Sequence, residues 1–290
     1  MPETTDPAAD GTKIPPSSPR TLGRSARWAD LRLRILSAAV LAPLALGCIW
    51  IGGTAFAALI ALITVGLAYE WLALCGEPIL SLAAVPFAVL PLSVALTASG
   101  LTPAALILLA VATAAASFGG LSRSRPLAFG IPYFGLAAVA LIWLRQPPHS
   151  GGANVIVLLL IVWASDIGAY IAGRAIGGPR LAPAISPGKT WSGALGGLAA
   201  AAAVGVAAAS ILSAAPLSGR PAAIAVLIGL ISQAGDLFES QLKRHFGVKD
   251  SGTMIPGHGG LLDRLDAVLT AAPATALLAL VVGPGVVLWQ

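Results

Sequence analysis

The sequence predicts an all-α, polytopic integral membrane protein with about nine transmembrane helices and a cytoplasmic N-terminus. Hydrophobic residues make up 57% of its 290 residues, charged residues make up 10%, and the mean hydropathy is +0.88. Soluble domains carry roughly 25% charged residues, so this chain has too few charges to cover a water-facing surface. Its apolar residues also fall in runs of about the 20 residues that a membrane-spanning helix needs. The lysines and arginines gather on one side of these runs.

Nine apolar runs are long enough to be candidate spans, and they follow one another through most of the chain. In order, they cover residues 35–52, 54–74, 79–98, 101–119, 127–144, 154–173, 193–212, 221–238 and 267–288. The third and fourth runs are interrupted by Pro86, Pro91 and Pro103, and proline breaks the hydrogen-bond ladder of a helix. The seventh begins with Gly193 and Gly197, a GxxxG pair that favours close packing against another helix.

The polar segments outside these runs divide the chain into three parts. Residues 1–33 are rich in Pro, Ser and Thr and become arginine-rich toward their end, which predicts a disordered, basic cytoplasmic tail. Residues 34–150 would form the N-terminal transmembrane helices, and residues 151–290 would form a C-terminal transmembrane catalytic region. The two longest polar loops, near 174–192 and 239–266, both belong to this third part.

The positive-inside rule orients the predicted spans. With the tail in the cytoplasm, all of the 17 lysines and arginines except Arg145 and Arg220 fall on the cytoplasmic side. The acidic residues lie in the tail, in cytoplasmic loops or toward the cytoplasmic ends of spans. We therefore expect a multi-pass protein of the inner (cytoplasmic) membrane, embedded in the lipid bilayer, with an active site that faces the cytoplasm.

Two compositional features exclude other classes. The formal net charge is +5, but its distribution follows membrane topology, so we expect no nucleic-acid partner. The only cysteines, Cys48 and Cys75, lie inside apolar runs and indicate neither a disulfide framework nor a metal site.

The segment 236–266, between the last two predicted spans, carries the densest group of charged residues. It holds four basic residues and five carboxylates, and the positive-inside rule accounts only for the basic ones. Asp236, Ser240 and Lys243 stand at positions i, i+4 and i+7. This spacing predicts that they share one face of a helix that emerges from the bilayer.

Two further carboxylates, Asp263 and Asp266, stand three positions apart where the last span begins. A carboxylate at a helix N-terminus is stabilised by the helix dipole by about 0.3–1 kcal/mol, which accounts for one of the two. Together with Asp236, the pair also forms a candidate site for Mg²⁺, which prefers carboxylate and phosphate oxygens. The spacing leaves both interpretations open.

Asp166 lies inside an apolar span, near its cytoplasmic end. An aspartate within a span costs on the order of 2.5–3.5 kcal/mol on insertion scales, so we expect this one to face a polar cavity with a partner. A cation-coupled membrane transporter is the alternative function, because it would also use an intramembrane carboxylate. Such a transporter would need polar exits on both faces, and the outer face of the predicted topology is almost free of ionisable residues.

Two loops could offer contacts to phosphate groups. The first, Ser186-Pro187-Gly188-Lys189-Thr190, is not a P-loop, because GxxxxGK[ST] requires a glycine where Pro183 stands. It can still present two hydroxyls and one ammonium to a nucleotide. In the second loop, glycines surround His258, and glycine lets a backbone approach phosphate closely. Such a turn can also simply end a helix.

Residues 240–266 resemble the sequence signature of the phosphatidate cytidylyltransferase (CDP-diacylglycerol synthase) family, S-x-[LIVMF]-K-R-x4-K-D-x-[GSA]-x2-[LIF]-[PG]-x-H-G-G-[LIVMF]-x-D-R-[LIVMFT]-D. The matching residues are Ser240, Leu242, Lys243, Arg244, Lys249, Asp250, Gly252, Ile255, Pro256, His258, Gly259, Gly260, Leu261, Asp263, Arg264, Leu265 and Asp266. Residues 166–173 are similar to the D-x-G-A-Y-x-x-G element of this family, and residues 185–191 to its I-S-P-x-K-T-W element. Gly188 departs from the family pattern, which commonly has a second lysine there, and Ser192 stands where glutamate is common.

The resemblance implies an enzyme that converts CTP and phosphatidate to CDP-diacylglycerol and pyrophosphate at the inner leaflet. It implies metal-assisted, in-line attack of the lipid phosphate on the α-phosphate of CTP, with Mg²⁺ as cofactor, K⁺ as a candidate second cation and a homodimer as a candidate assembly. The implied metal ligands are Asp236, Asp263 and Asp266. The implied catalytic residues are Asp263, Asp236, Lys243, Arg264 and His258. The implied substrate-binding residues are Ser186, Lys189, Thr190, Ser240, Arg244, Lys249 and Asp166.

Overall fold

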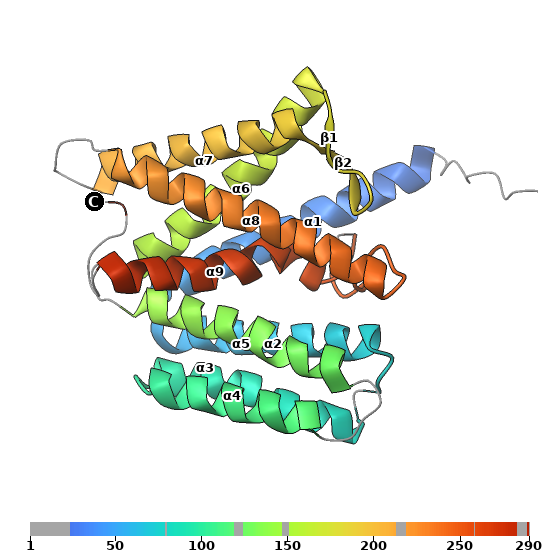
Figure 1. Cartoon of the computed structure of the whole chain (residues 1–290), viewed down its shortest axis with the longest axis vertical. Helices are drawn as coiled ribbons and strands as arrows, with labels where there is room; N and C mark the ends of the chain where they lie inside the picture. Colours follow the sequence, from blue (N-terminus) through green and yellow to red (C-terminus); the bar gives the residue numbers. More distant parts are fainter. Residues whose placement is uncertain are drawn as a thin grey trace, which may run out of the picture.

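The computed structural model is a bundle of α-helices with one short β-ribbon at an end of the bundle (Figure 1). It describes residues 24–78, 80–118, 124–146, 151–212, 219–257, 259–282 and 289. Residues 1–23 of the predicted tail lie outside this range, and the first helix begins at Arg24, inside the range predicted as tail.

In the described residues the chain forms nine α-helices, one 3₁₀ helix and two strands. They are α1 (Arg24–Ile51), α2 (Gly53–Leu74), η1 (Leu82–Ala88), α3 (Val89–Ala98), α4 (Thr102–Phe118), α5 (Ser124–Arg145), α6 (Gly151–Ile176), β1 (Arg180–Ala182), β2 (Ser186–Thr190), α7 (Trp191–Leu212), α8 (Arg220–His245) and α9 (Leu262–Val282). Each predicted apolar run overlaps one of the α-helices, which confirms the all-α fold class. The antiparallel ribbon β1–β2 was not predicted.

Six of these helices are long and apolar enough to cross a membrane. They are Gly53–Leu74, Pro126–Arg145, Gly151–Ile176, Trp191–Leu212, Arg220–His245 and Leu262–Val281. Shorter apolar helices occupy Ala39–Ile51, Leu82–Ala98 and Thr102–Phe118, and the second of these contains η1, which includes Pro86. The chain is therefore a multi-pass membrane protein, while the count of nine spans and the cytoplasmic N-terminus stay predictions.

Helix α9 joins the two halves of the bundle, because it packs against α5 on one side and α8 on the other (Figure 1). One apolar cluster, centred on Trp71, Leu90 and Phe134, joins α2–α5 and reaches α9 through Leu262 and Leu269. A second cluster fills the space among α6, α7, α8 and α9, with residues from α1, α2 and α5. The first turn of α9 therefore packs, through Leu262, against the apolar cluster of α2–α5.

The close packing predicted from the GxxxG pair is confirmed between α6 and α7. A Cβ atom on Gly193 would lie 2.8 Å from the carbonyl oxygen of Ala169, and one on Gly197 would lie 2.6 Å from that of Ser165. Since real Cβ atoms do not approach so closely, only glycine allows these backbones to meet. Because β2 ends directly before α7 begins, this contact between α6 and α7 also brings α6 close to the ribbon.

Helices α8 and α9 extend beyond the predicted spans. Helix α8 continues past residue 238 to His245, and α9 begins at Leu262 rather than at 267. Lys243, Arg244 and His245 in the last turn of α8 and Asp263 in the first turn of α9 complement the helix dipoles. The helix predicted to carry Asp236, Ser240 and Lys243 is therefore present as the end of α8, and Asp263 and Asp266 stand at the start of α9.

Candidate active site

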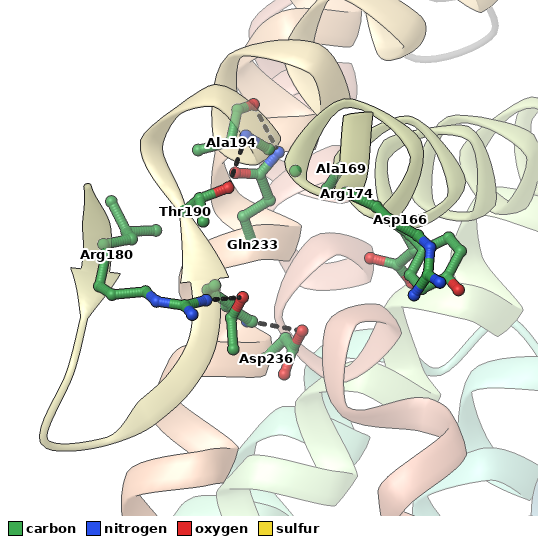
Figure 2. Close-up of a pocket in the computed structure, with 14 residues that line it drawn as sticks. Asp166, Ala169, Arg174, Arg180, Thr190, Ala194, Gln233 and Asp236 are labelled. Atoms are coloured by element: carbon green, nitrogen blue, oxygen red, sulfur yellow. Dashed lines mark hydrogen bonds and ion pairs between the residues drawn. The ribbon is translucent and has the colours of Figure 1, made fainter. Parts of the chain in front are cut away.

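A cleft of about 450 Å³ opens where α6, the β1–β2 ribbon, the start of α7 and α8 meet (Figure 2). Its walls combine charged side chains with small residues that leave room between the helices. The lining residues are Asp166, Ala169, Tyr170, Gly173, Arg174, Arg180, Leu181, Gly188, Lys189, Thr190, Gly193, Ala194, Gln233 and Asp236. Asp166 lines this cleft, as expected for an aspartate that faces a cavity.

Three predicted site residues from separate elements meet in this cleft: Asp166 on α6, Lys189 on β2 and Asp236 on α8. The Nζ atom of Lys189 lies 2.6 Å from Oδ2 of Asp236, and the two side chains are 27% and 30% exposed. This ion pair joins the ribbon to α8 across the cleft (Figure 2). Because both side chains remain partly open to solvent, each can exchange its partner for a ligand of matching charge.

The two predicted hydroxyl contacts are placed differently from each other. Thr190 lines the cleft, but its Oγ1 accepts the backbone N–H of Gly193 at 3.1 Å and so caps the start of α7. Ser186 pairs with Ala182 at the other end of the ribbon and is not among the described residues that line the cleft. The structure brings Thr190, but not Ser186, to the cleft.

The cleft residues with polar or charged side chains that the sequence-based prediction missed are Tyr170, Arg174, Arg180 and Gln233. The arginines had been assigned to membrane topology alone, although Arg180 donates from its guanidinium to the carbonyl of Gly188 at 3.2 Å and so braces the ribbon. Gln233 donates to Oγ of Ser165 at 3.0 Å and to the carbonyl oxygen of Ala194 at 3.2 Å. The position of Gln233 one helical turn before Asp236 was the signal that could have identified it.

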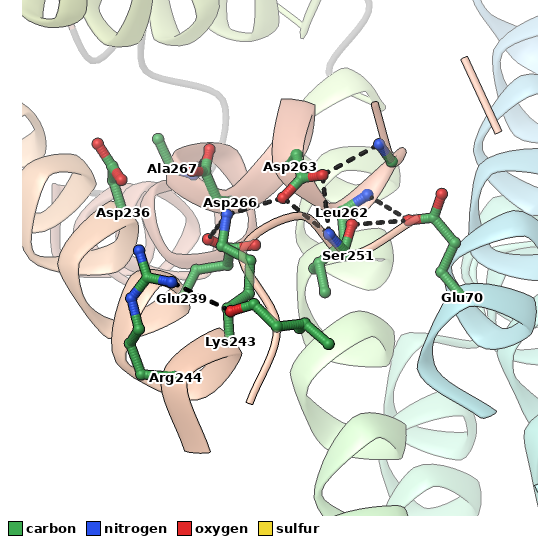
Figure 3. A network of polar contacts seen from close by, with 12 residues as sticks. Glu70, Asp236, Glu239, Lys243, Arg244, Ser251, Leu262, Asp263, Asp266 and Ala267 are labelled. Carbon is green, nitrogen blue, oxygen red and sulfur yellow. Dashed lines mark hydrogen bonds and ion pairs between the residues drawn. The ribbon is translucent and has the colours of Figure 1, made fainter. Parts of the chain in front are cut away.

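A second polar group lies at the α8–α9 junction and is centred on Lys243 (Figure 3). Its Nζ atom lies 2.7 Å from Oε2 of Glu239 and 2.7 Å from Oδ1 of Asp263. The Glu239 side chain is fully buried, and that of Asp263 is 7% exposed. Buried charges persist where they are paired, and Lys243 provides one cation shared by a carboxylate on each helix.

Asp263 also holds the loop that precedes α9. Its carboxylate accepts the backbone N–H of Ser251 at 3.0 and 3.2 Å and that of Gly260 at 3.0 Å. Together with Lys243, these donors surround both oxygens of the side chain (Figure 3). In this structure Asp263 therefore acts as an anchor for the loop 246–261.

Glu70, on α2, completes this second group and was also missed. It is only 2% exposed, and its carboxylate accepts hydrogen bonds from the backbone N–H groups of Leu261 and Leu262. The signal was present in the sequence, because Glu70 is an acidic residue within an apolar run. The argument that identified Asp166 applies equally to it.

Asp266 connects the two polar groups. Its carboxylate accepts the backbone N–H of Ala267 at 2.7 Å and interacts electrostatically with Asp236, Glu239 and Asp166. Carboxylates on α6, α8 and α9 thus repel one another. Mutual repulsion of this kind is relieved by a cation.

The donor set fits Mg²⁺ only if the substrate supplies ligands as well. Among the described residues, no group of three or more acidic, histidine or cysteine side chains is arranged to hold a metal ion. Mg²⁺, however, is commonly held by one or two carboxylates, several waters and substrate phosphates. Asp236 and Asp266 interact electrostatically, whereas the oxygens of Asp263 already accept several hydrogen bonds.

The remaining predicted residues lie around the second group. Arg244, Lys249 and Arg264 are exposed near the α8–α9 loop, and Ser240 is half-buried on α8. Arg244 donates to the carbonyl oxygen of Val248 at 3.2 Å, which closes the end of α8. His258 lies outside the described residues, so its predicted catalytic role is a sequence-based expectation only.

The comparisons with known proteins agree with the resemblance found in the sequence. The cytidylyltransferase family model matches residues 32–282. The phosphatidate cytidylyltransferase of Brucella suis biovar 1 is 39% identical over 254 residues, which cover 84% of this chain and 91% of that protein. The protein of the same name from Pseudomonas aeruginosa is 38% identical over 272 residues, which cover 88% of this chain and 99% of that protein. This chain therefore belongs to the cytidylyltransferase family of nucleotidyl-transferring enzymes.

Proposed function

We propose that this protein transfers the cytidylyl group of CTP to the phosphate of phosphatidate, forming CDP-diacylglycerol and releasing pyrophosphate. Two relatives that cover most of the chain are named phosphatidate cytidylyltransferase. The observation that carries the proposal is the cleft in which Lys189, Arg174 and Asp236 meet at the polar end of α6 and α8. Family membership and this cleft favour the enzyme over the alternative of a cation-coupled transporter.

The cleft suits a triphosphate that approaches from the aqueous side. Arg174, Arg180 and Lys189 all line it, and arginine and lysine are the residues that most often bind phosphate oxygens. The ammonium of Lys189 would leave Asp236 for a phosphate oxygen when the nucleotide binds. The carboxylate of Asp236 would then be free to act as a metal ligand.

The lipid phosphate is itself the nucleophile, so the reaction needs no covalent intermediate on the enzyme. The protein has to bring one phosphate oxygen in line with the α-phosphorus of CTP and to neutralise charge on the leaving pyrophosphate. Arg244, Lys249 and Arg264 are exposed near the helix ends, where they would hold a phosphate at the membrane surface. Lys243 would act mainly through Asp263, because it is paired with buried carboxylates.

Mg²⁺, with K⁺ as a candidate second cation, is part of this proposal. Asp236 and Asp266 would hold the ion together with phosphate oxygens, with Asp166 close enough to interact with both. When bound, a divalent cation supplies positive charge that stabilises the leaving pyrophosphate. Asp263 would support this arrangement through the loop and Lys243, and a direct bond to the ion would require it to release a hydrogen-bond donor.

We further propose that the cleft faces the cytoplasm from the inner membrane. CTP is a soluble cytoplasmic nucleotide, and the distribution of lysine and arginine favours this orientation. A homodimer, which the resemblance suggests, would have to form through surfaces other than Gly193 and Gly197, because these pack against α6 within one chain.

Release of pyrophosphate by the purified protein tests the reaction. We expect release from CTP that requires both phosphatidate and Mg²⁺, with CDP-diacylglycerol identified by mass spectrometry. Lys189→Gln should raise the KM for CTP, while Arg220→Gln, a charge loss at the opposite end of α8, should leave the kinetics unchanged. Pyrophosphate release that does not depend on phosphatidate would contradict the proposed substrate.

A further inference from the structure

We infer that Glu70 is a positioning residue of the active site, acting from the N-terminal half of the chain on the loop and helix end that carry Asp263. This inference rests on the proposed function. Glu70 lies on α2 and its residue is 2% exposed, so it does not contact a substrate in the cleft. Its effect would pass through the residues that it holds.

Three hydrogen bonds fix the loop to this carboxylate. Oε1 of Glu70 accepts the backbone N–H of Leu261 at 2.7 Å, and Oε2 accepts that of Leu262 at 2.9 Å. Oε2 also accepts the hydroxyl of Ser251 at 3.2 Å. The first N–H groups of a helix have no partner within the helix, so Glu70 acts as a cap for α9 that comes from a distant part of the chain.

The same loop is held from its other side by Asp263. Ser251 donates its hydroxyl to Glu70 and its backbone N–H to Asp263, so one residue bridges the two carboxylates. Asp263 in turn accepts a hydrogen bond from Lys243, which is also paired with Glu239. A continuous polar chain therefore runs from α2 through the loop and α9 to α8 (Figure 3).

Two glycines show that the loop backbone is fitted to Glu70. A Cβ atom on Gly252 would lie 2.9 Å from Oε1 of Glu70, and one on Gly260 would lie 2.8 Å from Oε2. Any other residue at these positions would push the loop away from the carboxylate. Gly257 and Gly259, by contrast, adopt positive φ angles of 76° and 85°, which the turn itself requires.

The acceptor must be a carboxylate because donors meet both of its oxygens. In Glu70→Gln, one oxygen becomes an NH₂ group that would face an N–H or O–H donor, and a buried donor without an acceptor is unfavourable. The loop and the first turn of α9 would then lose their fixed position. Asp263 stands in this turn and Asp266 follows in the next, so Asp263 and its partner Lys243 would lose their fixed positions.

Steady-state kinetics and hydrogen–deuterium exchange of the full-length enzyme test the inference. We expect Glu70→Gln to lower kcat at least tenfold while the KM for CTP changes little, because Lys189 and Arg174 remain in place. Deuterium uptake should rise in residues 251–262 and stay unchanged in the ribbon at 180–190. Glu77→Gln is the matched control, since Glu77 follows the end of α2 and is partly exposed, and it should leave both measurements unchanged.

Ser251→Ala removes one of the three hydrogen bonds and gives a milder test if Glu70→Gln does not fold. It should lower kcat less than Glu70→Gln and raise exchange in the same segment. If deuterium uptake at residues 251–262 of Glu70→Gln equals that of the wild type, the inference is overturned. If Glu70→Gln does not fold, the same result in Ser251→Ala overturns it. If the wild-type enzyme shows no phosphatidate-dependent release of pyrophosphate, the proposed function fails, and the exchange data still decide whether Glu70 holds the loop.

Discussion

Oδ1 of Asp263 lies 2.7 Å from the ammonium nitrogen of Lys243, and this contact joins the end of α8 to the start of α9. The family resemblance implies that Asp263 is a metal ligand and that Lys243 is a catalytic residue. In this structure the two side chains pair with each other, and Glu239 is a second partner of the lysine. Together they join the end of α8 to the start of α9 and to the backbone of Ser251 and Gly260.

Asp263→Asn should reduce cytidylyl transfer severely. The change removes a negative charge beside Lys243 and turns one acceptor oxygen into a donor opposite the N–H groups of Ser251 and Gly260. Loss of several kcal/mol of transition-state stabilisation corresponds to a rate reduction of roughly 10² or more. The measurement is Mg²⁺-dependent transfer by purified enzyme in detergent, at matched expression.

A titration with Mg²⁺ separates the two roles of Asp263. If the carboxylate binds the ion, the variant should need more Mg²⁺ for half-maximal rate. If it only anchors the loop, the Mg²⁺ requirement should match that of the wild type while the maximal rate falls. A rate within about threefold of the wild type, a difference of less than 1 kcal/mol, would remove Asp263 from both roles.

Lys243→Met should destabilise the protein strongly. The change leaves the carboxylates of Glu239 and Asp263 without their shared cation, and breaking a buried ion pair typically costs about 3–5 kcal/mol. Thermal unfolding in detergent should show a clear fall in Tm. Arg244→Met is the matched control, because Arg244 is the next residue on α8 and is exposed. Equal shifts in the two variants would mean that the pairing of Lys243 contributes nothing.

Gly188→Lys should lower the KM for CTP. A Cβ atom at Gly188 would meet no described heavy atom within 4 Å, and the residue lines the cleft. A lysine would add a second cation beside Lys189, as the family pattern commonly has, and a partly exposed charge pair is worth about 0.2–1 kcal/mol. The measurement is the KM for CTP of the variant and of the wild type at low and at high salt. The variant should have the lower KM at low salt, and the difference should disappear at high salt, which screens exposed charges. A higher KM would show that this position needs glycine.

The N-terminus should lie in the cytoplasm and the C-terminus outside. With nine spans the two ends fall on opposite sides of the membrane. The excess of lysine and arginine on one side predicts that the N-terminus is the cytoplasmic end. Reporter fusions that are active on only one side of the membrane, placed at each end in turn, measure this. Both reporters responding on the same side would mean that the number of spans is even.

The sequence was sufficient to predict where the helices are, because lipid demands about 20 apolar residues for each crossing and such runs stand out. It was less informative about where α8 and α9 end. A hydropathy run stops at the first charged residues, whereas helical hydrogen bonding continues through Glu239 and Lys243 and begins again at Leu262. The ribbon β1–β2 was missed because its five-residue second strand has no regular alternation of apolar and polar residues.

Local patterns within one helix or one motif pointed to several residues that the fold brings together, but they did not show which residues meet across the fold. Asp236 and Lys189 were identified from local patterns, and they meet in the cleft. Arg174 and Arg180 were attributed to topology, since a positive charge near a membrane serves both purposes. Glu70 could have been identified as an acidic residue within an apolar run, but its partners are 181 to 192 residues away, and no local spacing records such a contact.

The distance in sequence between Glu70 and its partners has a consequence for biosynthesis. A ribosome adds about 5–20 residues per second, so the 191 residues from Glu70 to Leu261 take roughly 10–40 s to make. During that interval α2 holds a carboxylate whose amide partners do not yet exist. A nascent chain released before α9 is made would therefore leave this carboxylate without its amide partners.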